Sequence, residues 1–413
     1  MIWLSRVYQA AVRLLMRFIH WPAPMVLEGE GSILRLPERL IADGVHKPLV
    51  ITGPTLHRLG TVNGLLQALD AAGIPAAVFD RVANDPTIAN VEDALATYQA
   101  GSCDAIIAFG GGSPMDCAKL CAARVARPQT PVRAMRGMLR VRRALPPLYA
   151  VPTTSGTGSE VTVAAVVTDE QHRKYAVTDF VLVPRVAVLD PTLTYGMPAG
   201  VTAASGMDAL CHAVEAYIGQ SNTKQTRADA LIAVQQVYRH LPTAYRDGQN
   251  AAARAGMQQA AYYAGLAFTR AYVGYVHALA HAVGGRYGLA HGVACAILMP
   301  ATLRAYGPAA LPQLAALAIA AGVAQPTDAV PVQAEAFLQS LEALNRELGL
   351  PAALEPLQKA DIPLLAAQAA NEGNLTYPAP KVLQARELAS ILQSLLPANN
   401  ETARGTAGFP IRQ

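Results

Sequence analysis

The sequence has little cysteine and no closely spaced cysteine pair. Its cysteines are odd in number and form no C-x-x-C motif. Such usage argues against a disulfide framework and against a zinc knuckle. We therefore expect reduced thiols and a cytoplasmic location. The five positions are Cys103, Cys117, Cys121, Cys211 and Cys295.

Long apolar runs are also absent, and so is a strong charge of one sign. No run reaches the roughly 18 residues of a membrane span, and the chain lacks a clean secretory signal at its start. The formal net charge is only +4 over 413 residues, and the basic residues are spread along the chain. A nucleic-acid partner therefore gains little support. The 52% of hydrophobic residues predicts a globular protein with a large core.

Acidic residues are missing from the start of the chain, where Glu28 is the first. The preceding segment, Met1–His20, is predicted to form an amphipathic helix. Such a helix suits a membrane surface or an organelle presequence, but amphipathic helices more often pack on protein. We expect it to dock on this chain or on a partner subunit. Its polar side carries Arg6, Gln9, Arg13, Arg17 and His20.

A second basic stretch spans residues 133–143. Such a run could attract an anionic substrate, a phosphate or a lipid, yet charged stretches are usually solvated faces. We expect a solvated face without a catalytic role. The arginines are Arg133, Arg136, Arg140, Arg142 and Arg143.

Between Pro48 and Asp190, short apolar segments alternate with helical periodicity. This alternation predicts an α/β domain with a parallel sheet, covered by helices and binding ligands at the carboxyl ends of its strands. Beyond the Pro- and Gly-rich stretch Pro191–Gly206, helical patterns continue to about Leu396, which predicts an all-α domain. The expected strands are 48–52, 76–80, 105–109, 149–152 and 187–190, and the clearest helices between them are 59–72 and 91–100.

Two glycine- and hydroxyl-rich segments follow predicted strands. In the first, Gly110, Gly111, Gly112 and Ser113 precede a helix opened by Pro114. Glycines allow close approach to a pyrophosphate, Ser113 can cap the helix, and the helix N-terminus offers amides to anionic oxygens. The segment is neither G-x-G-x-x-G nor a Walker loop, so a purely structural turn stays an alternative.

The second segment, Val151–Glu160, places four hydroxyl side chains around two glycines. Hydroxyls and free amides together can bind a diphosphate. A Ser/Thr-rich surface loop would have the same composition. The presence of two such segments favours a phosphate-binding function for both.

The helical half concentrates imidazoles at metal-ligand spacing. Asp208 and His212 lie four residues apart, as do His277 and His281, and His291 follows after Gly284–Gly285, which we expect to end the helix. Buried imidazoles need partners for both ring nitrogens, and a divalent metal such as Fe2+ or Zn2+ would supply one. Core histidines bonded to carbonyls, or a metal-free general base, are the alternatives.

Together these motifs resemble the iron-containing, or group III, alcohol dehydrogenase family over about residues 25–396. The resemblance rests on Gly110–Lys119, Pro152–Glu160, Gly206–Glu215 and Gly274–His281 with Tyr287–Gly292. It implies a Rossmann-like dinucleotide-binding domain followed by an all-helical domain, the architecture of dehydroquinate synthase. The expected parts are an N-terminal helical extension (1–24), the dinucleotide-binding domain (25–195) and the metal-binding helical domain (196–413).

The resemblance also implies roles for single residues. Asp208, His212, His277 and His291 would hold the metal, Fe2+ in the first place and Zn2+ as an alternative, and His281 would exchange protons near the substrate. NAD(H) or NADP(H) would contact residues of the first domain. These are Gly53, Asp85, Gly110, Gly111, Gly112, Ser113, Asp116, Thr153, Thr154, Thr157, Thr162, Lys174 and Leu193.

One position departs from the family pattern. Gly53 stands where many NAD-preferring members have an aspartate that binds the adenosine ribose. A carboxylate there repels a 2′-phosphate, so its absence makes NADPH possible without excluding NADH. We expect dual use.

The expected activity is interconversion of small alcohols and aldehydes or ketones by hydride transfer, with the metal as Lewis acid. Phe268, Tyr272, Tyr275 and Tyr287 suggest a site for a small, apolar substrate. A homodimer is implied by the resemblance. A hydroxyacid–oxoacid transhydrogenase is the main alternative, and a dehydroquinate-synthase-like lyase and an inactive scaffold are weaker ones.

Overall fold

The computed structural model describes residues 6, 7, 9, 10, 19, 21–171 and 173–397. The chain forms two compact units. One is Trp21–Gly196, and the other contains the described residues from Met197 onward together with those before Trp21.

The first unit is built on a six-stranded parallel sheet with strand order β1-β9-β6-β4-β2-β3. Every residue of β2, β4, β6 and β9 is buried, as expected for parallel strands covered on both faces. The strands are β1 (Met25–Glu28), β2 (Pro48–Ile51), β3 (Ala77–Phe79), β4 (Ala105–Gly110), β6 (Leu148–Pro152) and β9 (Val186–Leu189).

Helices cover this sheet, and the longest of those described begins at the glycine-rich turn. Helix α6 starts at Gly112 with Gly111 as its N-cap, whereas α5 is capped by the side chain of Thr87. The helices are α2 (Leu36–Ala42), α3 (Pro54–Arg58), α4 (Asn63–Ala71), α5 (Ile88–Ala100) and α6 (Gly112–Ala126).

Two parts of this unit differ from the sequence expectation. The edge strand β1 was not predicted, because its apolar run is only three residues long and none of its four residues is fully buried. A separate small sheet of β5 (Gly137–Met138), β8 (Lys174–Thr178) and β7 (Ala164–Thr168) was also missed. Alternating exposure in β8 shows that this sheet is covered on one side only.

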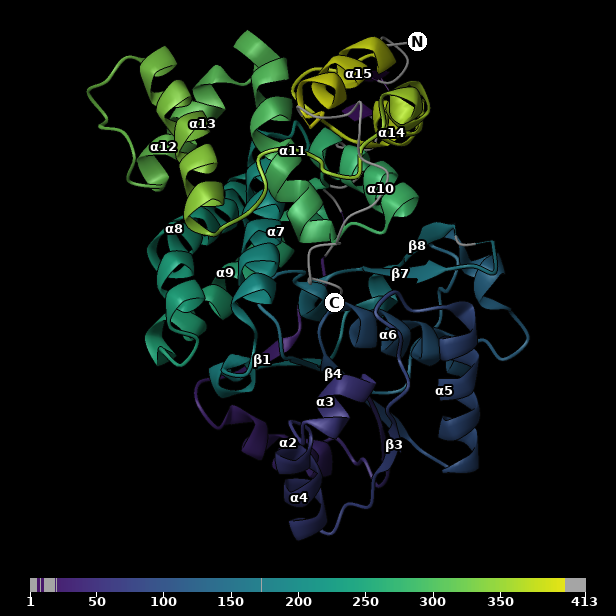
Figure 1. The fold of residues 1–413 in the computed structure, drawn as a ribbon. Helices are drawn as coiled ribbons and strands as arrows, with labels where there is room; N and C mark the ends of the chain where they lie inside the picture. Colours follow the sequence, from purple (N-terminus) through teal and green to yellow (C-terminus); the bar gives the residue numbers. More distant parts are fainter. Residues whose placement is uncertain (1–5, 8, 11–18, 20, 172, 398–413) are drawn as a thin grey trace. The chain divides into compact units, whose positions relative to one another are not determined.

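In the second unit, all described regular elements are helices (Figure 1). Helix α7 packs against α8, α9 and α11, and most of its residues are buried. It begins at Ala199, inside the Pro- and Gly-rich stretch 191–206 that was expected to precede the helical pattern. The helices are α7 (Ala199–Ile218), α8 (Lys224–Arg246), α9 (Ala251–Ala271), α10 (Tyr275–Tyr287), α11 (His291–Tyr306), α12 (Leu311–Ala320), α13 (Val330–Glu347), α14 (Ile362–Thr376) and α15 (Ala385–Ser394).

Helix α10 also ends later than predicted. Gly284 and Gly285 lie inside it, and the helix stops at Gly288, whose φ of +67° closes the C-terminus in a left-handed conformation. None of the described helices is both long and apolar enough to cross a membrane.

The N-terminal segment contacts the helical unit where it is described. Arg6 donates to the carbonyls of Ala379 and Pro380, each at 2.9 Å, and Gln9 Nε2 donates to the carbonyl of Tyr377 at 2.9 Å. The segment therefore docks on protein at these residues. Arg13, Arg17 and His20 lie outside the described residues.

Candidate functional site

Three helices of the second unit bring the candidate metal ligands together. Asp208 and His212 lie one turn apart on α7, His277 lies in the first turn of α10, and His291 is the first residue of α11. Helix α11 lies against α7 at Gly292, where an added Cβ would come within 2.0 Å of the carbonyl oxygen of Ala204. Only glycine allows this approach, which brings His291 to Asp208.

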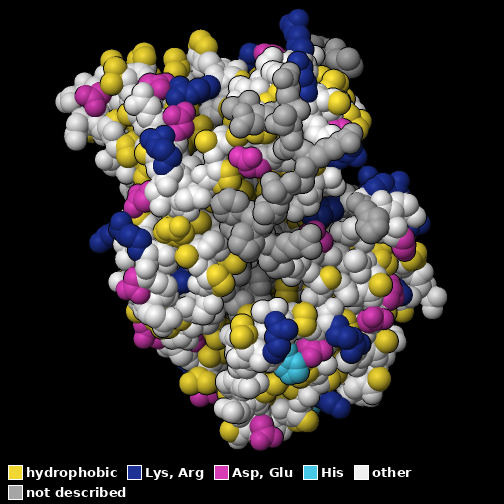
Figure 2. Space-filling model, in the orientation of Figure 1, with side chains coloured by type: hydrophobic (Ala, Val, Ile, Leu, Met, Phe, Trp, Pro, Cys, Tyr) yellow, Lys and Arg dark blue, Asp and Glu magenta, His cyan; other side chains and the backbone are white. Residues whose placement is uncertain are grey.

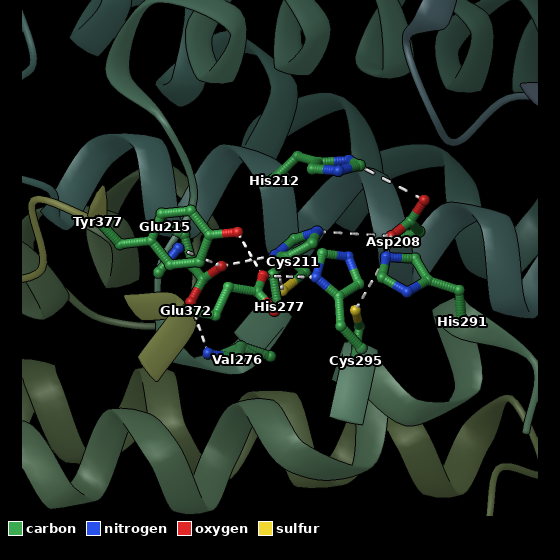
Figure 3. A network of polar contacts seen from close by, with 12 residues as sticks. Asp208, Cys211, His212, Glu215, Val276, His277, His291, Cys295, Glu372 and Tyr377 are labelled. Carbon is green, nitrogen blue, oxygen red and sulfur yellow. Dashed lines mark hydrogen bonds and ion pairs between the residues drawn. The ribbon is translucent and has the colours of Figure 1, made fainter. Parts of the chain in front are cut away.

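The ligand atoms converge on the carboxylate of Asp208 (Figure 3). Its Oδ1 lies 3.4 Å from Nε2 of His291 and 3.9 Å from Nε2 of His277, and its Oδ2 lies 4.0 Å from Nδ1 of His212. Two ligand atoms of one tetrahedral ion lie about 3.4 Å apart when each metal bond is roughly 2.1 Å long. The spacing therefore fits a single divalent ion.

Two of these atoms have no other partner among the described residues. Asp208 Oδ1 and His277 Nε2 are both buried, and neither atom takes part in a hydrogen bond. Leaving such atoms unsatisfied costs roughly 1–3 kcal/mol each. A cation shared by them would remove that penalty, so the residues present fit a bound metal.

Glu215 on α7 orients His277. Its Oε2 lies 2.6 Å from Nδ1 of His277 and also accepts the amide of Gly274, while Oε1 accepts the amide of Val276. With Nδ1 held by a carboxylate, Nε2 of the same ring is directed to Asp208. Carboxylates behind histidine ligands commonly fix ring orientation in this way.

Burial and charge shape the ionisation of this cluster. Burial raises the pKa of Asp208 to about 6, although the neighbouring His291 and His277 act in the opposite direction. Burial opposes a charge on His277, but Cys295, Glu215 and Asp208 raise its pKa to about 10. The centre therefore attracts a cation, either a proton or a metal ion.

His281 lies one turn beyond His277 and has its own carboxylate. Its Nδ1 is 2.7 Å from Oε1 of Glu372 on α14, and the hydroxyl of Tyr377 donates to the same oxygen at 2.5 Å. These two hydrogen bonds lower the pKa of Glu372, although burial acts against ionisation. The His281 side chain is 43% exposed, so this imidazole is accessible to water for proton exchange.

Two thiols complete the surroundings of the metal candidates. Sγ of Cys295 lies 3.6 Å from Nε2 of His291, and Sγ of Cys211 lies 3.7 Å from Nδ1 of His277. Cys211 and Cys295 also hydrogen-bond to each other. All five cysteines are free and buried, in agreement with the expected absence of disulfides.

The aromatic residues predicted near this centre have different positions. Phe268 stacks on His212 with ring centroids 4.0 Å apart. Tyr275 is fully buried and donates to Asn374, and the hydroxyl of Tyr287 donates to Asp361 at 2.7 Å. Of these residues, Phe268 is therefore in ring contact with a candidate ligand, whereas Tyr275 and Tyr287 are held by partners elsewhere.

In the first unit, the two predicted loops lie side by side. An added Cβ at Gly111 would come within 3.1 Å of the Thr154 hydroxyl, and one at Gly112 within 3.0 Å of Thr157 Cγ2. The amide of Thr153 donates to the carbonyl of Gly110 at 3.0 Å. The glycines therefore keep open the space between the start of α6 and the threonine loop.

Some polar residues expected at the cofactor instead connect parts of the fold. The carboxylate of Asp116 is partly buried and accepts from Ser159 Oγ and from the amide of Val166, each at 3.0 Å. Ser113 was expected to cap α6, but Gly111 is the N-cap and the Ser113 hydroxyl donates to the carbonyl of Asn84. A local loop contact thus replaces the expected cap.

The remaining predicted cofactor residues spread over the same unit. Thr162 is buried and accepts from the Nζ of Lys119 at 2.9 Å, while Lys174 and Asp85 form an ion pair at 2.7 Å. Leu193 packs against the core of the sheet. Gly53 lies between β2 and α3 as the N-cap of that helix.

The surface carries mixed charge on the face shown in Figure 2, where basic and acidic side chains are interspersed. The arginines of 133–143 are exposed, as predicted for a solvated face. Arg133 pairs with Glu170, and Arg136 lies over the ring of Tyr175.

Sequence reasoning missed Glu215, Glu372, Tyr377 and Cys295 as residues of the site. Glu215 was part of a quoted motif, and its helical position seven residues after Asp208 could have suggested a second carboxylate on the same face. Glu372 is 91 residues from His281, so no local spacing indicates their contact.

Comparison with known proteins identifies the family. Residues 23–191 match the iron-containing alcohol dehydrogenase family, and residues 202–396 match its C-terminal domain. The 1,3-propanediol dehydrogenase of Citrobacter freundii is 37% identical over 372 residues, covering 88% of this chain and 95% of the relative.

Solved structures support the same family assignment. The crystal structure of a 1,3-propanediol oxidoreductase has a TM-score of 0.89 and 35% identity, covering 92% of this chain and 100% of its own. The sulfoacetaldehyde reductase of Bifidobacterium kashiwanohense, solved with NAD+, has a TM-score of 0.82 and 26% identity, covering 92% of this chain and 99% of its own. The predicted resemblance is thus confirmed, and this chain belongs to the iron-containing alcohol dehydrogenase family.

Proposed function

We propose that this member of the family interconverts small alcohols and aldehydes with NAD(P) and a divalent metal, Fe2+ in the first place, held by Asp208, His212, His277 and His291. The observation that carries the proposal is the convergence of buried ligand atoms on Asp208. Its Oδ1 and the Nε2 of His277 are orphaned and 3.9 Å apart. Residues from three helices, α7, α10 and α11, make this arrangement. Histidines with a purely structural role would be expected to have hydrogen-bond partners for their buried ring nitrogens.

A divalent ion bound there supplies a Lewis acid for the oxygen of an alcohol or aldehyde. The protein's part is to hold the ligand geometry. Glu215 fixes the ring of His277 through Nδ1, and its contacts with the amides of Gly274 and Val276 tie that carboxylate to the start of α10. A preorganised site of this kind favours charge that develops on the substrate oxygen.

His281 is the proposed proton carrier. Glu372 at Nδ1 favours the tautomer whose proton lies on that nitrogen, which leaves Nε2 as an acceptor. Because the side chain is partly exposed, Nε2 can accept a proton at the site and release it to water.

The nicotinamide cofactor supplies or accepts the hydride. We assign its pyrophosphate to the turn of Gly110, Gly111 and Gly112, where the N-terminus of α6 offers backbone amides. The threonine loop with Thr154 and Thr157 borders that turn and offers hydroxyl donors. The absence of a carboxylate at Gly53 supports the use of both NADH and NADPH.

The test is to strip metal with a chelator, reload the protein anaerobically with Fe2+ or Zn2+, and follow oxidation of NADH and NADPH with short aldehydes. Activity that returns only with metal supports the proposal. Absence of turnover in every metal form would overturn it, and cofactor retained through purification would then favour a transhydrogenase.

We further propose a cytoplasmic homodimer. The free, buried thiols support the cytoplasmic location. The family resemblance supports the homodimer. Light scattering coupled to size-exclusion chromatography gives the assembly mass. Fractionation of the producing cells gives the location.

A further inference from the structure

A sulfur atom lies among the candidate ligand atoms. Asp208, His277, His291 and Cys295 each offer one ligand atom, and all four atoms lie within 4.8 Å of one another. The cysteine is fully buried on α11, one turn after His291. Its side chain therefore lies on the same face of the helix as that histidine.

The distances fit a metal–sulfur bond. An ion bound to nitrogen at about 2.1 Å and to sulfur at about 2.3 Å places the two ligand atoms roughly 3.6 Å apart in tetrahedral geometry. Sγ of Cys295 is 3.6 Å from Nε2 of His291, and that nitrogen is 3.4 Å from Asp208 Oδ1. The group matches a site with two nitrogens, one oxygen and one sulfur.

His212 has a different relation to Asp208. Its Nδ1 lies 4.0 Å from Oδ2, whereas both His277 and His291 approach Oδ1. The His212 ring is stacked between Phe268 and His277, at centroid distances of 4.0 Å and 4.6 Å. An ion placed against Oδ1 would therefore meet Cys295 in place of His212.

We propose that Cys295 is an alternative metal ligand, so that Asp208, His277 and His291 can share one ion either with His212 or with a thiolate. The proposal rests on the metal site proposed above and adds a sulfur ligand to it. Metal binding to the sulfur releases the thiol proton. Thiolate ligands favour zinc and cobalt(II) over harder cations.

Cobalt(II) provides the direct test, because it gives visible ligand-field bands in any protein site and a near-ultraviolet charge-transfer band only with a thiolate ligand. The protein is stripped of metal, kept reduced, and titrated anaerobically with cobalt(II). We expect both kinds of band in the unchanged protein and in C211A. We expect only the visible bands in C295A and C295S, with unchanged far-ultraviolet circular dichroism.

The outcomes are distinct. Visible bands without the near-ultraviolet band in the unchanged protein would overturn the sulfur ligand and leave the proposed metal site intact. A charge-transfer band lost in C211A but kept in C295A would also overturn it. Failure to bind cobalt would overturn both proposals.

Metal selectivity gives a second test that, like the cobalt(II) spectrum, does not depend on activity. We expect the C295S dissociation constant for Zn2+ to rise about tenfold or more, while that for Mn2+ changes little. Equal changes for the two ions would argue for general disturbance of the site and against a sulfur ligand. C211S is the matched control, because it changes the neighbouring thiol and leaves Cys295 in place.

Discussion

Glu215 holds His277 through a contact of 2.6 Å between Oε2 and Nδ1, and both side chains are almost wholly buried. The same carboxylate satisfies two amides at the start of α10. One side chain on α7 thus sets both the ring orientation of a ligand on α10 and the position of that helix.

We predict that E215Q weakens metal binding while preserving the fold. Glutamine has the same shape but can accept hydrogen bonds through one oxygen only, so either His277 or an amide loses its partner. Loss of such an outer contact typically lowers metal affinity about 10–100-fold. Titration with Zn2+ against a competing chelator measures the change, with E355Q, a substitution of an exposed carboxylate, as the control. Unchanged affinity in E215Q would contradict the role.

We predict that H281A lowers kcat by about a hundredfold, because proton transfer by a positioned side chain contributes at least that factor. Metal content should not change. E372Q should give a smaller loss in the same parameter, and adding it to H281A should cost nothing further, because Glu372 acts through His281. Additive losses in the double variant would show that Glu372 acts on its own.

The sequence predicted what depends on local spacing. The pair Asp208 and His212 share a helix face because they are four residues apart, and the apolar runs at β2 and β4 predict buried strands. At each of these positions the secondary structure depends mainly on a few neighbouring residues, so the sequence predicts it.

Contacts between distant elements were beyond such reasoning. Glu372 reaches His281 across 91 positions, and Cys295 was noted only for having no cysteine partner at close spacing. The strand β1 pairs with β9 through backbone hydrogen bonds. Its short, partly exposed segment gives no clear strand pattern in the sequence. These contacts form only when the elements pack together. They join residues far apart in the sequence, so the local periodicity of either segment does not predict them.

We predict a pH dependence of stability in the first unit that originates at Glu160. Burial raises the pKa of this carboxyl to about 7 from an ordinary value near 4.5. The folded state therefore favours the protonated form, and the stability this gives is present below about pH 4.5 and lost as the pH rises through about 7. E160Q removes the ionisation.

Thermal unfolding followed by circular dichroism between pH 5 and pH 8 tests this. The midpoint of the unchanged protein should fall relative to that of E160Q as the pH rises. E38Q, which replaces an exposed carboxylate of α2 and keeps Glu160, should hold a constant difference in midpoint from the unchanged protein across this range. A constant difference between wild type and E160Q would mean that Glu160 does not titrate in this range.

We predict that G53D shifts cofactor use toward NADH. An added Cβ at Gly53 meets only the carbonyl oxygen of Val82, at 3.7 Å, and aspartate is favoured at a helix N-cap, so the fold should tolerate the change. Like charges about 4 Å apart repel by roughly 1–4 kcal/mol between bulk water and a protein surface. NADPH turnover should therefore fall about tenfold or more relative to NADH. G53N, which adds similar bulk without charge, is the control, and an equal loss in both variants would indicate a steric effect.

Finally, we predict that R6A destabilises the helical unit. The Arg6 guanidinium bonds the carbonyls of Ala379 and Pro380 and the Oε1 of Gln220 at 3.1 Å, so its loss leaves acceptors that water must satisfy. Hydrogen bonds from a charged donor suggest a loss of about 1–2 kcal/mol in the free energy of unfolding. Urea unfolding measures it, with R386A, at an exposed arginine of α15, as the control. If R6A left stability unchanged but reduced binding to anionic lipid vesicles, the N-terminal segment would face a membrane surface, and the docked arrangement would not be its state in solution.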